Sequence, residues 1–116
     1  MNKVKIYHDP RCSKSRNALA FLEDNGVDVE IVKYLDTPPS HEELAKLLDM
    51  LGLTAKGLMR TKEEIYKELG LKEIIDENAL IDAMVANPRL IERPIVVREG
   101  KAAIGRPLEN IVELMS

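Results

Sequence analysis

Hydrophobic and polar residues near the N-terminus follow a pattern that predicts a strand, a helix and a second strand. Residues 4–7 are mostly apolar and predict the first strand, which Asp9-Pro10 ends. From Ser13 onward, apolar residues recur at helical spacing until Asn25-Gly26, a typical end signal for a helix. Residues 27–34 are rich in valine and isoleucine and predict the second strand. Two strands joined by a short helix are expected to be parallel, with a right-handed crossover.

A helical pattern then continues over about residues 38–90 and predicts a helical insert. Ser40 with Glu43, and Thr61 with Glu64, have the spacing of capping boxes, and Asp76 can cap a further helix. Leucine, isoleucine and methionine side chains share one face of these segments. Such stripes predict buried faces, and we assign them no chemical role.

The C-terminal part predicts a hairpin and a closing helix. Residues 94–98 and 101–104 form two short strands around Glu99-Gly100, so they are expected to be antiparallel. The closing helix carries a stripe of four apolar residues, Leu108, Ile111, Val112 and Met115. The order is therefore βαβ, insert, ββα, which predicts an α/β fold with a four-stranded mixed sheet. Residues 1–116 are expected to form a single domain.

Charge, cysteine count and hydrophobicity exclude several classes of protein. Seventeen basic and twenty acidic side chains give a net charge of −3, which argues against nonspecific binding to nucleic acid or to an anionic membrane surface. One cysteine cannot form an intramolecular disulfide, and no segment approaches the ~18 consecutive apolar residues of a membrane span. We therefore expect a soluble protein in the cytoplasm, where thiols are kept reduced. One cysteine and two separated histidines also fall short of ordinary metal spacing.

The single cysteine has the surroundings of a reactive thiol. Cys12 precedes the predicted helix start, where unpaired N–H groups and the helix dipole favour an anion such as a thiolate. Arg11, Lys14 and Arg16 add positive charge nearby. One helical turn can also bring the Ser15 hydroxyl back toward the sulfur as a donor. A buried structural cysteine is the ordinary alternative, but this polar, basic loop favours reactivity.

Three arginines adjoin breaks in the pattern and are candidates for binding an anion. Arg60 lies between two short helical pieces, and Arg93 and Arg106 each precede a proline, which favours an extended backbone at the arginine. Guanidinium groups suit tetrahedral oxyanions because they present several donors in one plane. A thiolate beside such groups would be a nucleophile in an oxyanion site.

These residues resemble the glutaredoxin-coupled arsenate reductase family, within the thioredoxin-like arsenate reductase and Spx superfamily. The likeness covers essentially the whole chain and rests on His8-x3-Cys12-x3-Arg16 and on the stretches YLDTPPS, LMR, NPRLIERPIVV and IGRP. It implies a thioredoxin-like fold with a cis Pro94. Arg11 and Lys14 are bulky cations where well-established arsenate reductases tend to have small or uncharged residues. The stretch RCSKSR is more similar to a subgroup whose members are called arsenate reductases by sequence similarity.

The resemblance also implies roles for individual residues. Cys12 would be the nucleophile, with His8, Ser15 and Arg16 stabilising its thiolate, and Arg60, Arg93 and Arg106 would bind the oxyanion. His8 could equally be a hydrogen-bonded histidine at a strand end. The substrate would be arsenate and the product arsenite. Glutathione would act as co-substrate and glutaredoxin as partner, with no bound cofactor.

Because the chain has one thiol, an external thiol must complete any reduction. A cysteine phosphatase would need an arginine six residues after Cys12, where the chain has Ala18. Two alternatives stay open at this point. One is a general monothiol oxidoreductase acting on another substrate, and the other is a non-enzymatic, Spx-like protein that binds RNA polymerase. Spx members that sense through a disulfide use Cys-x-x-Cys, which Ser15 precludes here.

Overall fold

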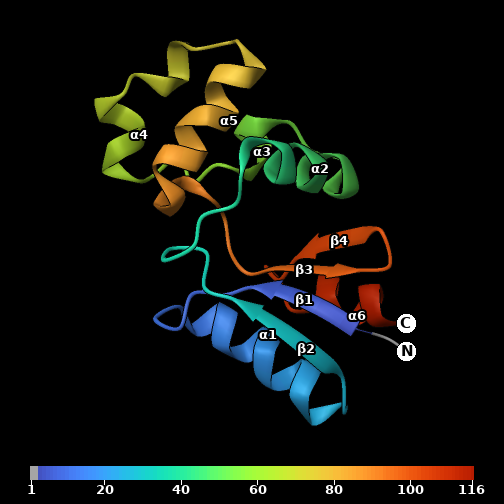
Figure 1. Ribbon diagram of the computed structural model, residues 1–116. Coiled ribbons are helices and arrows are strands. Elements are labelled where there is room, and N and C mark those ends of the chain that lie inside the picture. The colour runs from blue at the N-terminus through green and yellow to red at the C-terminus, as the bar shows by residue number, and fades with distance from the viewer. Residues whose placement is uncertain (1–2) are drawn as a thin grey trace. The chain divides into compact units, whose positions relative to one another are not determined.

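The computed structural model describes residues 3–116, and its sheet has the predicted strands (Figure 1). The four strands are ordered β2-β1-β3-β4 and span β1 (Lys3–Tyr7), β2 (Asp28–Val32), β3 (Ile95–Arg98) and β4 (Lys101–Ile104). Strands β1 and β2 are parallel, whereas β3 is antiparallel to both β1 and β4. The predicted α/β, thioredoxin-like fold with a mixed sheet is confirmed.

The chain divides into two compact units. The first contains residues 3–37 and Arg93–Ser116, and therefore the whole sheet, and the second is Pro38–Glu92. The second unit closely matches the insert predicted over about 38–90. The grouping of all 116 residues into one domain stays a prediction. In the described part of the chain, no helix is long and apolar enough to cross a membrane.

Helix α1 (Ser13–Asp24) connects the parallel strands and begins where the sequence predicted. Cys12 is its N-cap residue, and the backbone turns away after Asn25 through Gly26, whose φ is +70°. Glycine adopts this left-handed conformation at no steric cost, so the helix ends sharply and the chain enters β2.

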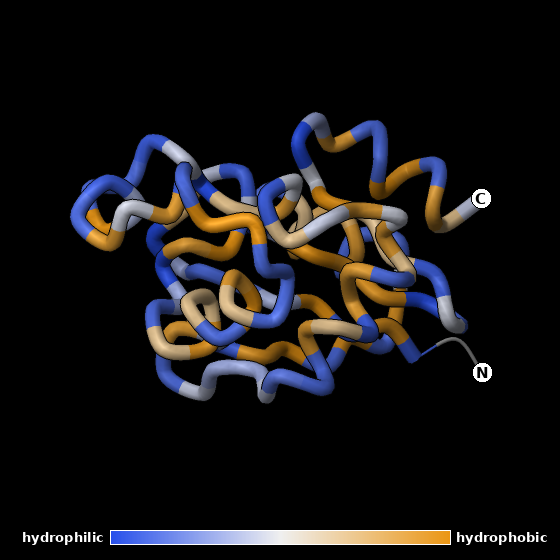
Figure 2. Tube along the Cα trace, turned by 90° about the horizontal axis from the view of Figure 1, so that it is seen from above, coloured by the Kyte–Doolittle hydropathy of each residue, from blue (hydrophilic) through white to orange (hydrophobic). Residues whose placement is uncertain are grey.

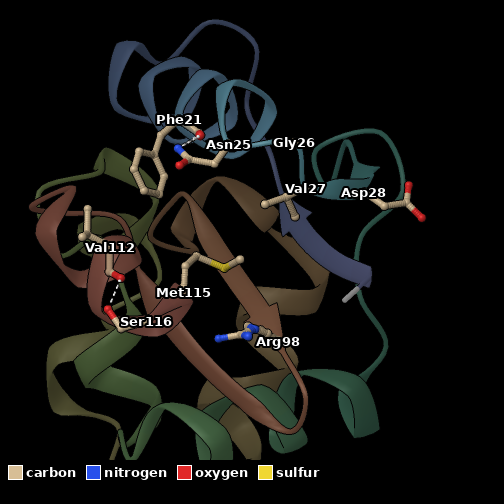
Figure 3. A pocket seen from close by; sticks show the side chains of 9 residues that line it. All are labelled: Phe21, Asn25, Gly26, Val27, Asp28, Arg98, Val112, Met115 and Ser116. Carbon is tan, nitrogen blue, oxygen red and sulfur yellow. Dashed lines mark hydrogen bonds between the residues drawn. The ribbon is translucent and has the colours of Figure 1, made fainter. Parts of the chain in front are cut away.

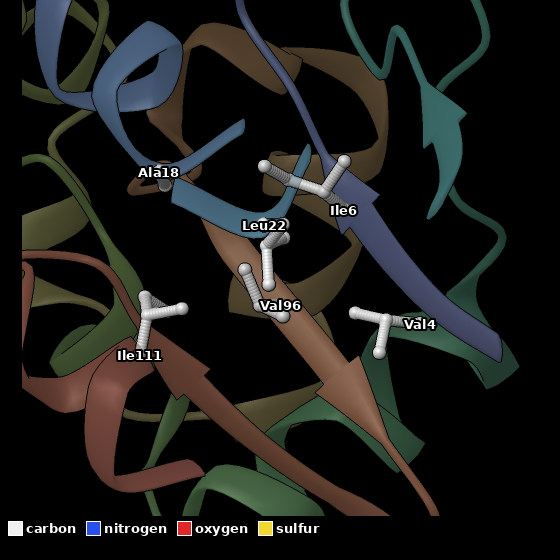
Figure 4. Packing of buried hydrophobic residues seen from close by; sticks show 6 residues of the cluster. All are labelled: Val4, Ile6, Ala18, Leu22, Val96 and Ile111. Atoms are coloured by element: carbon white, nitrogen blue, oxygen red, sulfur yellow. The ribbon is translucent and has the colours of Figure 1, made fainter. Parts of the chain in front are cut away.

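Six buried residues form the core of the first unit (Figure 4). They come from β1, α1, β3 and helix α6 (Glu109–Met115) and are Val4, Ile6, Ala18, Leu22, Val96 and Ile111. Two strands and two helices thus meet on one face of the sheet. This packing fixes the N-terminal end of α1 relative to the start of β3, the two places where the candidate site residues lie.

The second unit is helical, as predicted. Its elements are α2 (His41–Leu51), α3 (Ala55–Leu58), α4 (Glu64–Glu68), α5 (Glu77–Ala86) and two short 3₁₀ helices, η1 (Leu71–Glu73) and η2 (Pro88–Leu90). Helices α2 and α3 pack against α5. Along the chain, hydrophilic and hydrophobic positions alternate in Figure 2, as expected for helices and strands with one apolar face. The buried side chains of the second unit include Leu44, Leu47, Leu58, Leu80 and Met84.

One predicted helix cap is confirmed, and two other local predictions differ from the structure. The Ser40 hydroxyl accepts the Glu43 N–H at 3.1 Å, as predicted for a cap. The Thr61 capping box is wrong, because α4 begins at Glu64 and its N-cap residue is Glu63. On α6, Ile111 is buried but Val112 is 42% exposed, so the predicted apolar stripe is only partly covered.

Candidate active site

The loop between β1 and α1 is shaped by Asp9 and presents Cys12 at the helix start. The Cys12 N–H donates to the Asp9 carbonyl oxygen at 3.0 Å, and the Arg11 N–H donates to Asp9 Oδ1 at 3.0 Å. These two bonds close a tight turn before the helix. Cys12 is 9% exposed.

Four hydrogen-bonding or charged groups surround the Cys12 sulfur. Arg106 Nη2 lies 3.1 Å from Cys12 Sγ. Burial alone would raise the pKa of the Cys12 thiol, but the Ser15 N–H, the Arg93 side chain, the Lys14 N–H and the charge of Arg106 together lower it below its ordinary value. The cysteine therefore has the electrostatic surroundings of a nucleophilic thiolate.

Arg93 and Arg106 converge on Cys12, as predicted for two of the three arginines. Arg106 uses its Nε to donate to the Arg93 carbonyl oxygen at 2.7 Å, which aims its Nη2 at the sulfur. Both arginines precede cis prolines. The cis Arg93-Pro94 bond confirms the expectation, and the cis Arg106-Pro107 bond is a finding that sequence reasoning missed.

The Ser15 hydroxyl contacts His8 and Asp9. It accepts the Asp9 N–H at 3.0 Å and lies 2.6 Å from His8 Nδ1, and both side chains are buried. A hydroxyl has one proton and two acceptor lone pairs, so Ser15 can hold both contacts, and the donor in the His8 pair depends on the imidazole tautomer. The predicted hydroxyl-to-sulfur bond stays a prediction, because these two contacts hold the hydroxyl on the side of His8 and Asp9. Ser15 contributes its backbone N–H to Cys12.

His8 is a buried, neutral hydrogen-bonding partner rather than a cation beside the sulfur. Burial lowers its pKa, with Asp9 opposing the shift and the charges of Lys33 and Arg16 adding to it. This arrangement agrees with the alternative in which His8 is a hydrogen-bonded histidine at a strand end. Its effect on Cys12 would pass through Ser15.

Arg16 holds the loop. Its Nη1 donates to the Pro10 carbonyl oxygen at 3.0 Å on the exposed side of the turn. Arg11 and Lys14 are exposed as well, so their side chains add charge at the rim. Lys14 contributes its backbone N–H to the Cys12 sulfur. The part of Arg16 in stabilising the thiolate stays a prediction.

Sequence reasoning missed two residues that hold Arg93. Asp9 is 5% exposed, and its Oδ2 lies 3.2 Å from Arg93 Nε. Tyr34 is 1% exposed and hydrogen-bonds with the Arg93 side chain, while burial raises the pKa of its hydroxyl. The sequence pattern presents Asp9 as the end of a strand and Tyr34 as a strand residue. A carboxylate between a strand end and a cationic loop was the available signal for Asp9.

Arg60 belongs to the second unit, where two carboxylates flank it. Its Nη1 lies 3.0 Å from Glu63 Oε2, and its Nε lies 3.5 Å from Glu92 Oε1. These ion pairs offset the charge of a partly buried arginine. The convergence of Arg60 on Cys12 stays a prediction.

A separate pocket of about 580 Å³ lies at the other end of α1 (Figure 3). It is lined by the C-terminal part of α1, by the residues that follow it, and by the ends of β3 and α6, including Phe21, Asn25, Asp28, Arg98 and Met115. None of its lining residues is one of the groups that contact the Cys12 sulfur.

The fold and the thiol site together define a thioredoxin-like protein with a cysteine of lowered pKa at a helix N-terminus and a cis proline directly before β3. Residues 7–114 match the ArsC family, and the chain belongs to this family.

Two curated relatives are named arsenate reductase. The one from Neisseria meningitidis serogroup A is 56% identical over 113 residues, which cover 96% of this chain and 97% of the relative. The one from Escherichia coli strain K12 is 40% identical over 116 residues, covering 99% of this chain and 82% of the relative. A solved structure titled arsenate reductase, from Vibrio cholerae, superposes with a TM-score of 0.92 at 51% identity and covers 96% of each chain.

Proposed function

We propose that the protein reduces arsenate to arsenite with Cys12 as the nucleophile. The observation that carries this proposal is the contact of Arg106 with the Cys12 sulfur at 3.1 Å, in a site where Arg93 and two backbone N–H groups also lower the thiol pKa. An arginine beside a thiolate both stabilises the nucleophile and attracts an oxyanion to it. The names of the relatives support arsenate as that oxyanion.

The chemistry begins with attack of the Cys12 thiolate on arsenic(V). A sulfur–arsenic bond forms, and one arsenate hydroxyl leaves with a proton as water. Arg93 and Arg106 would hold the remaining oxygens and offset their negative charge, and we assign Arg60 the same role. Ser15 and Lys14 would hold the sulfur through their N–H groups, with His8 fixing the Ser15 hydroxyl and Arg16 fixing the loop.

A second thiol must then supply the electrons, because the chain contains a single cysteine. We assign this step to glutathione, whose thiolate attacks the Cys12 sulfur. The new sulfur–sulfur bond forms as the sulfur–arsenic bond breaks, and the electron pair of the broken bond reduces arsenic(V) to arsenic(III), released as arsenite. Glutaredoxin would reduce the resulting mixed disulfide and restore Cys12 by thiol–disulfide exchange. The cytoplasm would supply both reductants.

The test is NADPH oxidation coupled through glutathione reductase, glutathione and glutaredoxin. We expect oxidation that depends on arsenate and that is abolished by Cys12→Ser. A second assay without glutaredoxin shows whether the reaction needs this reductant, independently of whether arsenate is the substrate. If arsenate adds nothing while a small mixed disulfide is still reduced, the general monothiol oxidoreductase becomes the better account.

A further inference from the structure

Asp9 is an acidic residue in a site that otherwise offers positive charge to an anion. Its side chain is 6% exposed, and Oδ2 lies 3.2 Å from Arg93 Nε, whose own side chain is 16% exposed. Removing a carboxylate from water costs several kcal/mol unless it is paired, so a buried Asp9 requires a cation beside it. Arg93 supplies that cation.

The pairing leaves Arg93 as a directional donor with little net charge. Asp9 engages its Nε, Tyr34 hydrogen-bonds with the same side chain, and Arg93 in turn donates to Cys12. Within the unit that contains the thiol, the charges of Arg93 and Arg106 are matched by the Cys12 thiolate and the Asp9 carboxylate. These four groups therefore carry no surplus positive charge with which to offset a doubly charged anion.

We propose that Asp9 is a specificity-determining residue that makes the site prefer singly charged tetrahedral oxyanions over doubly charged ones. A second negative charge on the ligand is repelled by the thiolate and by Asp9. The cations outside these four groups offset it less, because Arg11 and Lys14 are exposed to solvent and Arg60 is itself paired with Glu63 and Glu92. Coulomb energy is proportional to the ligand charge, so the penalty from Asp9 on a dianion is twice that on a monoanion. This inference rests on the proposed function, because it concerns the oxyanion that Cys12 attacks.

Asp9 also shapes the loop, so the test must separate its charge from its structural contacts. Its Oδ1 accepts the Arg11 N–H while Oδ2 faces Arg93, and the asparagine of Asp9→Asn presents an oxygen to only one of these donors. A structural disturbance would weaken the binding of every anion by a similar factor. Loss of charge, in contrast, changes the ratio of the two affinities, so this ratio is the quantity to measure.

The experiment uses two anions of fixed charge at pH 7, sulfate as the dianion and methanesulfonate as the monoanion, at constant ionic strength. Each anion's binding constant is obtained from its protection of Cys12 against iodoacetamide, a neutral reagent. We expect Asp9→Asn to raise the sulfate-to-methanesulfonate affinity ratio by about threefold or more. Asp28→Asn is the matched control, since it removes one exposed carboxylate at the start of β2 and should leave the ratio unchanged.

An unchanged ratio in Asp9→Asn would overturn the proposal and leave Asp9 a purely structural role. Should that variant fail to fold, the natural protein still decides the matter. The proposal expects it to bind sulfate no more tightly than methanesulfonate, and tenfold tighter sulfate binding would refute it. If neither anion protects Cys12, the oxyanion site itself is wrong, and the proposed function fails together with this inference.

Discussion

At the scale of single residues, the reactivity of Cys12 depends on donors from two distant parts of the chain. The Lys14 and Ser15 N–H groups come from the start of α1, and the Arg93 and Arg106 side chains come from residues about eighty to ninety positions later. Local donors are present in any helix N-terminus, so the arginines distinguish this cysteine from other N-cap cysteines.

The first prediction concerns the pKa of the Cys12 thiol. The alkylation rate should rise with pH through an inflection below the ~8.5 of an ordinary thiol, and Arg106→Ala should raise that inflection by about one pH unit. The physical reason is loss of the charged donor 3.1 Å from Sγ. Stopped-time alkylation with iodoacetamide across a pH series measures it.

Arg89→Ala is the control, because Arg89 is exposed and belongs to the second unit, whereas the groups that lower the Cys12 pKa belong to the first. An inflection at or above ~8.5 in the natural protein would show that the surroundings do not activate the sulfur.

The second prediction concerns His8 and stability. Burial lowers the pKa of folded His8 below the 6.5 of an exposed histidine, so the unfolded chain binds a proton that the folded chain does not. The stabilisation is complete above the unfolded pKa and is lost as pH falls below it. The free energy of unfolding should therefore decrease between pH 7.5 and 5.5, by at most about 1.4 kcal/mol per pH unit below 6.5.

Urea unfolding at several pH values tests this expectation with two variants. His8→Asn keeps an acceptor near the Ser15 hydroxyl and removes the titrating ring, so most of the pH dependence should disappear. His41→Asn removes the exposed histidine that pairs with Asp82 and should leave the part due to His8 intact. Equal pH dependence in His8→Asn and the natural protein would mean that folded His8 titrates as it does in the unfolded chain.

At the scale of elements, the two proline-containing segments around the hairpin are joined through Gly105. Its N–H donates to the Pro94 carbonyl oxygen at 2.9 Å, and a Cβ at this position would meet Pro94 Cγ at 2.8 Å and Ile111 Cγ1 at 3.2 Å. Glycine is thus required by close packing, because Pro94 is a ring with little freedom to move. The residues on either side of this contact, Arg93 and Arg106, are the arginines beside Cys12.

The third prediction follows from this packing. Gly105→Ala should lower the free energy of unfolding by about 1–3 kcal/mol and also reduce Cys12 reactivity, because the added methyl group displaces Pro94. Urea unfolding and the alkylation rate measure the two effects.

Gly57→Ala is the matched control. A Cβ at Gly57 lies no closer than 3.4 Å to any neighbour and sits in α3, where alanine is the better helix former. It should leave stability equal or slightly higher and the alkylation rate unchanged. An equal free energy of unfolding in Gly105→Ala and the natural protein would show that Pro94 shifts away from the added methyl group without loss of stability.

The elements themselves were largely predictable from sequence, because periodicity and end signals are local. The strands, α1 and the hairpin appeared at or within a few residues of the predicted positions. The capping box predicted at Thr61 is wrong because its spacing to Glu64 is that of a capping box, whereas α4 begins at Glu64 itself. The site was only partly predictable. The ion pair of Asp9 with Arg93 joins residues 84 positions apart, and no local pattern reports such contacts.

At the scale of the whole molecule, the match to the ArsC family spans both compact units. The first unit alone contains Cys12, Arg93 and Arg106, together with the residues that hold them. The second unit contributes Arg60 to the predicted oxyanion site, paired with Glu63 and Glu92. In the predicted site, the insert takes part in the chemistry through Arg60.

The last prediction is that Arg60→Ala weakens arsenate reduction while leaving the chemistry of the free thiol unchanged. A hydrogen bond to a charged group contributes about 1.5–3 kcal/mol, so loss of one oxyanion contact should lower kcat/KM for arsenate by roughly tenfold to a hundredfold. Alkylation of Cys12 by iodoacetamide should not change, because that reagent is neutral and none of the groups that lower the thiol pKa is Arg60. Arg89→Ala, in the same unit, should alter neither rate. If Arg60→Ala slows both reactions equally, Arg60 supports the fold rather than the substrate. If it slows neither, the oxyanion is held by Arg93 and Arg106 alone, and the insert has no part in binding it.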